Sequence, residues 1–129
     1  MQAQSRPHPS DELLRCRPWI EAALERANGT HTFKDIVDGV VEGRMQFWPA
    51  ERGCLVTEIV VYPQKKVINV FLGGGELDQL ADMHGDVIAW AKSQGCTGAT
   101  IVGRKGWERA FRQYGWKPVF VTLAKEFDE

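Results

Sequence analysis

The sequence predicts an α/β fold whose sheet is mixed but mostly antiparallel, with helices on both faces. Two runs rich in β-branched residues, 54–62 and 67–72, are separated by the four residues PQKK, and this spacing predicts an antiparallel hairpin. A helical pattern and a further apolar strand, 98–102, follow. Strands joined through a helix in this way nearly always form a right-handed parallel crossover. We therefore expect one parallel strand pair, 67–72 with 98–102, in an otherwise antiparallel sheet.

The composition is that of an ordinary globular chain of 129 residues, with 43% hydrophobic and 26% charged residues. The 16 basic residues balance the 17 acidic ones, so no overall charge attracts nucleic acid, which is not expected as a partner. No apolar run is long enough to cross a membrane, and the N-terminus lacks the apolar core of a signal peptide. We expect a cytoplasmic protein without membrane contact.

The three cysteines, Cys16, Cys54 and Cys96, are far apart in the sequence and odd in number. No two of them have the spacing of zinc ligands, and the three histidines form no ligand pair. We therefore expect reduced thiols in or near a core, and no metal.

The chain begins with a segment that lacks any periodic pattern. Residues 1–9 contain two prolines, and we expect a flexible tail ahead of a single domain over 10–129. A short helical turn is expected over 11–16. Pro18 should interrupt it before a second helix over 20–27, because proline suits the first position of a helix and not its interior.

The next elements are a capped helix and a strand. Thr32 and Asp35 have the spacing of a capping box, and the apolar stripe that follows predicts a helix that ends at Gly43. A strand is expected over 44–48, and residues 49–53 read as the turn before the hairpin.

The C-terminal half contains the clearest sequence signals for where helices end. A helix is expected over 76–94, where Gly95 stops it. After the strand at 97–102, the apolar spacing of Trp107, Ala110, Phe111 and Tyr114 predicts a compact amphipathic helix. Gly115 ends this helix in a left-handed position, and a long final strand is expected to reach Phe127.

Three consecutive glycines, Gly73, Gly74 and Gly75, lie between the predicted central strand and the helix that begins at Glu76. Such a loop can bring the backbone close to a phosphate at the positive end of a helix. No Gly-Lys-Ser/Thr follows, so it is not a P-loop, and Asp78 stands in place of the third glycine of a dinucleotide fingerprint. Both a phosphate-binding loop and a simple tight turn remain open.

Arg104 and Lys105 follow the strand at 97–102, with Arg109 one helical turn further on. Ligands of open α/β sheets gather beyond the carboxyl ends of strands, where the glycine run also lies. These residues could therefore face the glycines across one crevice and bind an anion. The alternative is that they are solvated charges at the start of a helix.

Glu58 lies inside an apolar strand, between Thr57 and Ile59. It is either the solvent-facing residue of an alternating strand or a carboxylate in a cleft that acts as a general base. Trp48, Trp107 and Trp116 could stack on bases, but packing in or at the rim of the core is the simpler interpretation.

The order of these elements over residues 32–127 resembles the GCN5-related N-acetyltransferase (GNAT) superfamily. The central strand, the glycine run, the long helix and a short helix that ends at Gly115-Trp116 carry the resemblance. It implies an acyl-CoA, such as acetyl-CoA, bound between the parallel strands and attacked by an amine. Backbone N–H groups of Gly73, Gly74 and Gly75 would hold the pyrophosphate. On the hypothesis of an acyltransferase, Arg104 and Lys105 bind the outer phosphates and Glu58 is a candidate catalytic base.

Two positions depart from the superfamily pattern. Val70 stands where the phosphate loop usually begins with Gln or Arg, and Phe111 stands where a Tyr often acts as general acid. The sequence therefore supports two hypotheses. One is an N-acyltransferase, for a small-molecule or protein amine, without the usual acid. The other is a catalytically inactive GNAT-like phage structural or assembly protein, associated with a virion, that acts through protein partners or as a homo-oligomer.

Overall fold

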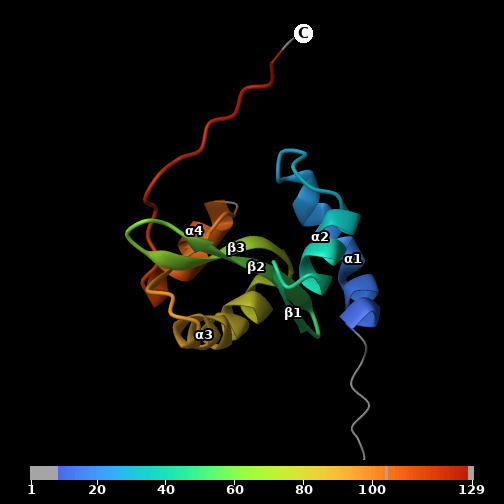
Figure 1. The fold of residues 1–129 in the computed structure, drawn as a ribbon, viewed down its shortest axis with the longest axis horizontal. Coiled ribbons are helices and arrows are strands. Elements are labelled where there is room, and N and C mark those ends of the chain that lie inside the picture. Colours follow the sequence, from blue (N-terminus) through green and yellow to red (C-terminus); the bar gives the residue numbers. More distant parts are fainter. Residues whose placement is uncertain (1–8, 104, 128–129) are drawn as a thin grey trace, which may run out of the picture.

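A computed structural model of the chain describes residues 9–103 and 105–127 (Figure 1). Most of the predicted flexible tail, residues 1–8, lies outside the described residues. Its last residue, Pro9, is the first residue of helix α1 (Pro9–Glu25).

The described residues form a sheet of four strands in the order β1–β2–β3–β4. Strand β2 (Gly53–Val61) pairs antiparallel with β1 (Gln46–Ala50) on one side and with β3 (Lys66–Gly75) on the other. Strand β4 (Gly98–Ile101) pairs parallel with β3. This confirms the predicted mixed, mostly antiparallel sheet. The strand predicted at 44–48 begins two residues later and includes Pro49, which is compatible with its place at the edge of the sheet.

Helices cover both faces of the sheet, as predicted (Figure 1). Helices α1 and α2 (Phe33–Val41) pack on one face and α3 (Leu77–Ser93) and α4 (Lys105–Phe111) on the other. Each pair of helices closes its own cluster of buried side chains. The first cluster includes Leu13, Cys16, Ile20, Ile36, Cys54, Val56 and Leu72; the second includes Leu55, Ile68, Val70, Leu80, Val87, Trp107 and Phe111.

Helix α1 is continuous, so the predicted interruption at Pro18 was wrong. Proline removes one backbone hydrogen bond, to the carbonyl of residue 14, but Leu14 is exposed and its carbonyl can turn to water. Leu13, Cys16, Ile20 and Leu24 form one buried stripe that crosses the proline. Burial along the whole stripe outweighs the single lost hydrogen bond.

Local capping signals are confirmed. Thr32 accepts a hydrogen bond from the Asp35 N–H, and the Asp35 carboxylate accepts one from the Thr32 N–H at 2.8 Å, which completes the capping box of α2. After α4, a 3₁₀ turn (Arg112–Tyr114) leads to Gly115 in the left-handed conformation at φ +91°.

The predicted final strand is absent: residues 117–127, the C-terminal segment, form no strand. Figure 1 shows this segment leaving the body of the molecule. A strand needs a hydrogen-bonding neighbour, and within the described residues this segment has none.

Candidate functional site

The two parallel strands separate at a defined point. The ladder joins Val67 through Val70 of β3 to β4, and the Val102 N–H donates to the Val70 carbonyl at 3.2 Å. Strand β3 then continues to Gly75 with β2 as its partner. Among the described strands, none pairs with residues 71–75 on the β4 side, so this stretch of β3 has one open edge.

A bulge marks the same point. Thr57 of β2 faces Val70, but its neighbour Val56 faces Leu72, so Phe71 is an extra residue on β3. A bulge bends a strand and increases its twist. The bulge lies where β4 stops pairing with β3. The Phe71 ring contacts the His31 ring edge-on, with centroids 4.7 Å apart.

The three glycines do not form a loop, and that prediction was wrong: they are the last residues of β3 and lie opposite Gly53, Cys54 and Leu55. A Cβ on Gly73 would lie 2.2 Å from the Trp107 ring, and one on Gly74 would lie 2.7 Å from the Trp19 carbonyl oxygen. Close packing of two tryptophans against the strand accounts for both glycines. Their role in binding pyrophosphate stays a prediction.

Trp107 fills the space between the diverging chains on the α3–α4 face. The indole is 8% exposed and lies against Gly73 and also against Gly103, where a Cβ would come within 2.9 Å of the ring. The cavity beside it is only about 10 Å³. A ligand between the strands would have to lie over this indole. Trp48, Trp107 and Trp116 all belong to the packing of this face, which confirms core and rim packing as their role.

A row of polar side chains crosses three strands next to the point of divergence. The Thr100 hydroxyl donates to Asn69 Oδ1 at 2.8 Å, and Asn69 Nδ2 donates to Glu58 Oε2 at 3.1 Å. Glu58 lies two residues from Val56, so it is on the α1–α2 face of the sheet. The half-buried Glu58 carboxylate is thus held in place by a side chain adjacent to Val70.

One cation near the start of α3 was not found by sequence analysis. Arg52 forms ion pairs with Glu76 and, at 3.6 Å, with Asp78. The hydrogen bond to Glu76 raises the pKa of Arg52. Its backbone N–H donates to the Gln79 side chain at 3.2 Å. Arg52 follows β1 and is 24 residues from Glu76, so no local spacing signalled the contact.

The structure does not test whether the other predicted anion-binding residues form a site. Arg104 lies outside the described residues, and Lys105 is placed only as the first residue of α4. Phe111, at the position of the superfamily's acid, is 3% exposed. Tyr114 contacts the His84 ring on the α3 side, with centroids 4.6 Å apart, and thus lies away from Glu58.

Comparison with solved structures identifies the fold. A predicted acetyltransferase from Clostridium acetobutylicum, solved with acetyl-CoA, has a TM-score of 0.69 at 10% identity, with 94% of each chain covered. A protein from Thermus thermophilus has a TM-score of 0.64 at 17% identity over 95% of each chain, and a possible acetyltransferase from Clostridium difficile has 0.58 at 8% over 96%. No protein-family model and no curated protein matches. The chain therefore has the fold of the GNAT superfamily.

The comparisons give no support to a phage origin or a place in a virion. No helix among the described residues is long and apolar enough to cross a membrane. Over the same residues, no group of three or more His, Cys, Asp or Glu side chains is placed to hold a metal ion.

Proposed function

We propose that this protein is an N-acyltransferase that takes an acyl group from an acyl-CoA and passes it to an amine. The observation that carries the proposal is the open edge of β3 over residues 71–75, which begins where β3 and β4 separate. The fold supports it, and so does the similarity to an acetyltransferase from Clostridium acetobutylicum that was solved with acetyl-CoA.

In this proposal the donor lies over Trp107 and along the open edge of β3. The pantetheine amides of a coenzyme A thioester can hydrogen-bond to backbone groups in the manner of an added strand. The diphosphate would lie toward the N-terminus of α3, where helix N–H groups favour negative charge. Arg52 stands at this helix end and would have to exchange its carboxylate partners for phosphate. Arg104 and Lys105 remain proposed ligands of the outer phosphates.

Glu58 is the proposed general base. At neutral pH an amine is protonated to ammonium, and it must lose a proton before its nitrogen can attack the thioester carbonyl. The new C–N bond then forms as the C–S bond breaks, coenzyme A leaves as a thiolate, and the nitrogen gives its second proton to solvent as it becomes an amide. Because a cysteine-type thiol has a pKa of about 8.5, the thiolate can leave without a protein acid and take its proton from water. The buried Phe111 is compatible with this chemistry.

Two measurements separate binding from catalysis. Calorimetry with acetyl-CoA tests the donor site, and thiol release in the presence of a panel of small amines and amine-bearing peptides tests transfer. Glu58→Gln should bind acetyl-CoA within a factor of two of wild type. It should lose thiol release about 100-fold or more, as expected when a general base is removed. Glu25→Gln, a substitution at an exposed residue of α1, is the matched control and should change neither quantity.

A second candidate is a GNAT-fold protein without catalysis that works through protein contacts. Two observations favour it: Phe111 cannot donate a proton, and Trp107 fills the floor between the strands. Absence of heat and of any thermal shift with millimolar acetyl-CoA would contradict the acyltransferase and support this candidate. Binding without thiol release for any amine would leave an acyl-CoA-binding protein.

A further inference from the structure

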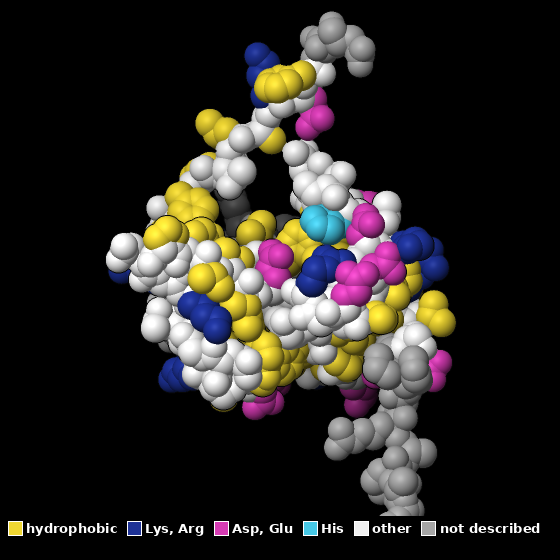
Figure 2. Space-filling view, in the orientation of Figure 1, with side chains coloured by type: hydrophobic (Ala, Val, Ile, Leu, Met, Phe, Trp, Pro, Cys, Tyr) yellow, Lys and Arg dark blue, Asp and Glu magenta, His cyan; other side chains and the backbone are white. Residues whose placement is uncertain are grey.

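The C-terminal segment exposes an unusual amount of apolar surface. Val119, Phe120, Val121, Leu123 and Phe127 are 68–90% exposed, whereas large apolar side chains elsewhere in the described chain mostly pack on one of the two cores. Figure 2 shows the segment standing clear of the body with its hydrophobic side chains uncovered. Soluble chains rarely leave such a contiguous apolar patch without a partner.

The segment has the composition of a central strand. Val119, Val121 and Leu123 alternate with Phe120, Thr122 and Ala124, so both faces of an extended chain would be largely apolar. Strands that are apolar on both faces lie inside sheets and have a neighbour on each edge. Pro118 precedes the run, at a position where a strand tolerates proline.

The sheet has an open edge of the matching kind. Strand β4 is the last strand in the order, and its outer edge pairs with no strand of the described chain. Val102 directs its N–H toward β3, so the alternation along a strand turns the peptide groups of Ile101 and Ala99 outward. An unpaired edge is a template for a strand from another chain.

We propose that two copies of this chain exchange their C-terminal segments, each segment pairing with the outer edge of β4 in the other copy. In this arrangement the two segments lie side by side at the centre of one sheet that runs through both copies. Every apolar strand then has a neighbour on each edge. Docking of the segment on β4 of its own chain would leave the backbone N–H and C=O groups on the outer edge of the segment unpaired.

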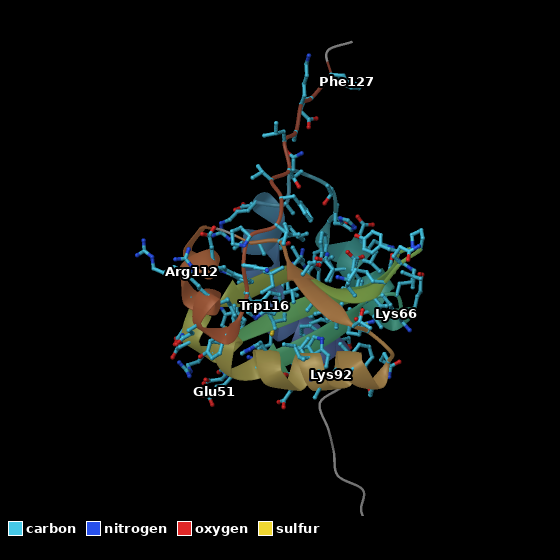
Figure 3. The ribbon with its side chains drawn as sticks, turned by 90° about the vertical axis from the view of Figure 1, so that its left-hand side faces the viewer. Glu51, Lys66, Lys92, Arg112, Trp116 and Phe127 are labelled. Carbon is cyan, nitrogen blue, oxygen red and sulfur yellow. The ribbon has the colours of Figure 1, made fainter. Side chains whose placement is uncertain are left out.

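The path of the chain and the available area both favour a second copy. Figure 3 shows Trp116 against the body and Phe127 at the far end of a segment that extends away from it. Eleven extended residues reach about 35 Å, far enough to cross to a neighbouring sheet. The two phenylalanines of each segment offer roughly 300–500 Å². Reciprocal exchange doubles this, and with the aliphatic side chains it approaches the roughly 1,200–2,000 Å² of a stable interface.

Light scattering of the full chain tests the proposal directly. Wild type should have a mass of about 29 kDa, twice the 14.5 kDa chain, at concentrations near 100 µM, where association with a dissociation constant of about 1 µM is essentially complete. Val121→Pro should raise the dimer dissociation constant by about 100-fold or more, because proline removes a ladder N–H and blocks the pairing. Val121→Ile keeps the apolar β-branched side chain and should remain dimeric.

Isotope-filtered NMR on a mixture of labelled and unlabelled wild-type chains distinguishes exchange from docking within one chain. Contacts between Val121 of one copy and Ala99 or Ile101 of the other support the exchange. The proposal is overturned if wild type is monomeric, if Val121→Pro dimerises as well as wild type does, or if the contacts arise only within one chain. Equal circular dichroism of the two Val121 variants checks that the body folds in both. If Val121→Pro fails this check, a chain that ends at Lys117 replaces it, and a dimer of that shortened chain also overturns the proposal.

Discussion

Helix α1 and the C-terminal segment lie near opposite ends of the described chain and carry similar apolar side chains in opposite environments. In α1, Leu13 and Ile20 are each 1% exposed, whereas Leu123 in the C-terminal segment is 90% exposed. A helix satisfies its backbone hydrogen bonds internally and needs only a surface to cover, which the sheet provides. An extended segment has to find backbone hydrogen-bond partners outside itself, so its apolar side chains stay exposed to solvent until another strand pairs with it.

Matched leucine substitutions should show the largest difference between these two regions. Leu13→Ala removes a fully buried side chain and should lower the free energy of unfolding by about 2–5 kcal/mol. Leu123→Ala should change it by less than about 0.5 kcal/mol, since the side chain contacts solvent. Urea denaturation should be measured with both substitutions in the Val121→Pro background, where the C-terminal segment has no partner. Equal losses in the two variants would show that the segment packs on the body.

A second matched pair tests whether a glycine is retained for packing or merely tolerated. A methyl group on Gly73 would meet the Trp107 indole, whereas one on Gly106 would meet nothing within 4 Å. Gly73→Ala should therefore cost about 1–3 kcal/mol of unfolding free energy through overpacking. Gly106→Ala in helix α4 should be neutral or stabilising by up to about 1 kcal/mol. Thermal unfolding of the two variants measures both effects, and a stable Gly73→Ala protein would contradict the packing described for Trp107.

The elements that sequence patterns predicted well are those whose cause is local. The hairpin, the capping box of Thr32 and Asp35, and the left-handed Gly115 each depend on residues within a few positions of one another. The mixed sheet with its parallel pair was also predictable, because chain connectivity limits how two strands joined by a helix can pair.

The features that sequence patterns missed depend on distant residues. The glycines of β3 are explained by Trp19 and Trp107, which are far away along the chain in opposite directions. The contact of Arg52 with Glu76 joins the end of β1 to the start of α3. Of the candidate site, Glu58 could be selected as a carboxylate in an apolar strand, but its Asn69 and Thr100 partners became evident only with the strand register.

The buried thiols beneath α1 provide the smallest and most specific test of the difference between the covered helix α1 and the uncovered C-terminal segment. Burial raises the pKa of both Cys16, on α1, and Cys54, on β2. In the unfolded chain a thiol loses its proton above about pH 8.5, whereas the raised pKa of each buried thiol holds its proton to higher pH. Stability should therefore be lost as the pH rises above that value, by about 1.4 kcal/mol per pH unit for each thiol that stays protonated.

Urea denaturation between pH 8 and 10 measures this slope. Cys54→Ala should reduce this slope by about 1.4 kcal/mol per pH unit, because only one thiol of the pair, Cys16, then differs in protonation between the folded and the unfolded chain. Val56→Ala removes buried apolar atoms from the same strand without removing a titrating group, so it should lower stability equally at every pH. Val121→Pro should leave the slope unchanged, because the C-terminal segment buries no titrating group on this core. An unaltered slope in Cys54→Ala would mean that water reaches the thiols, and that α1 covers the sheet less completely than its buried stripe indicates.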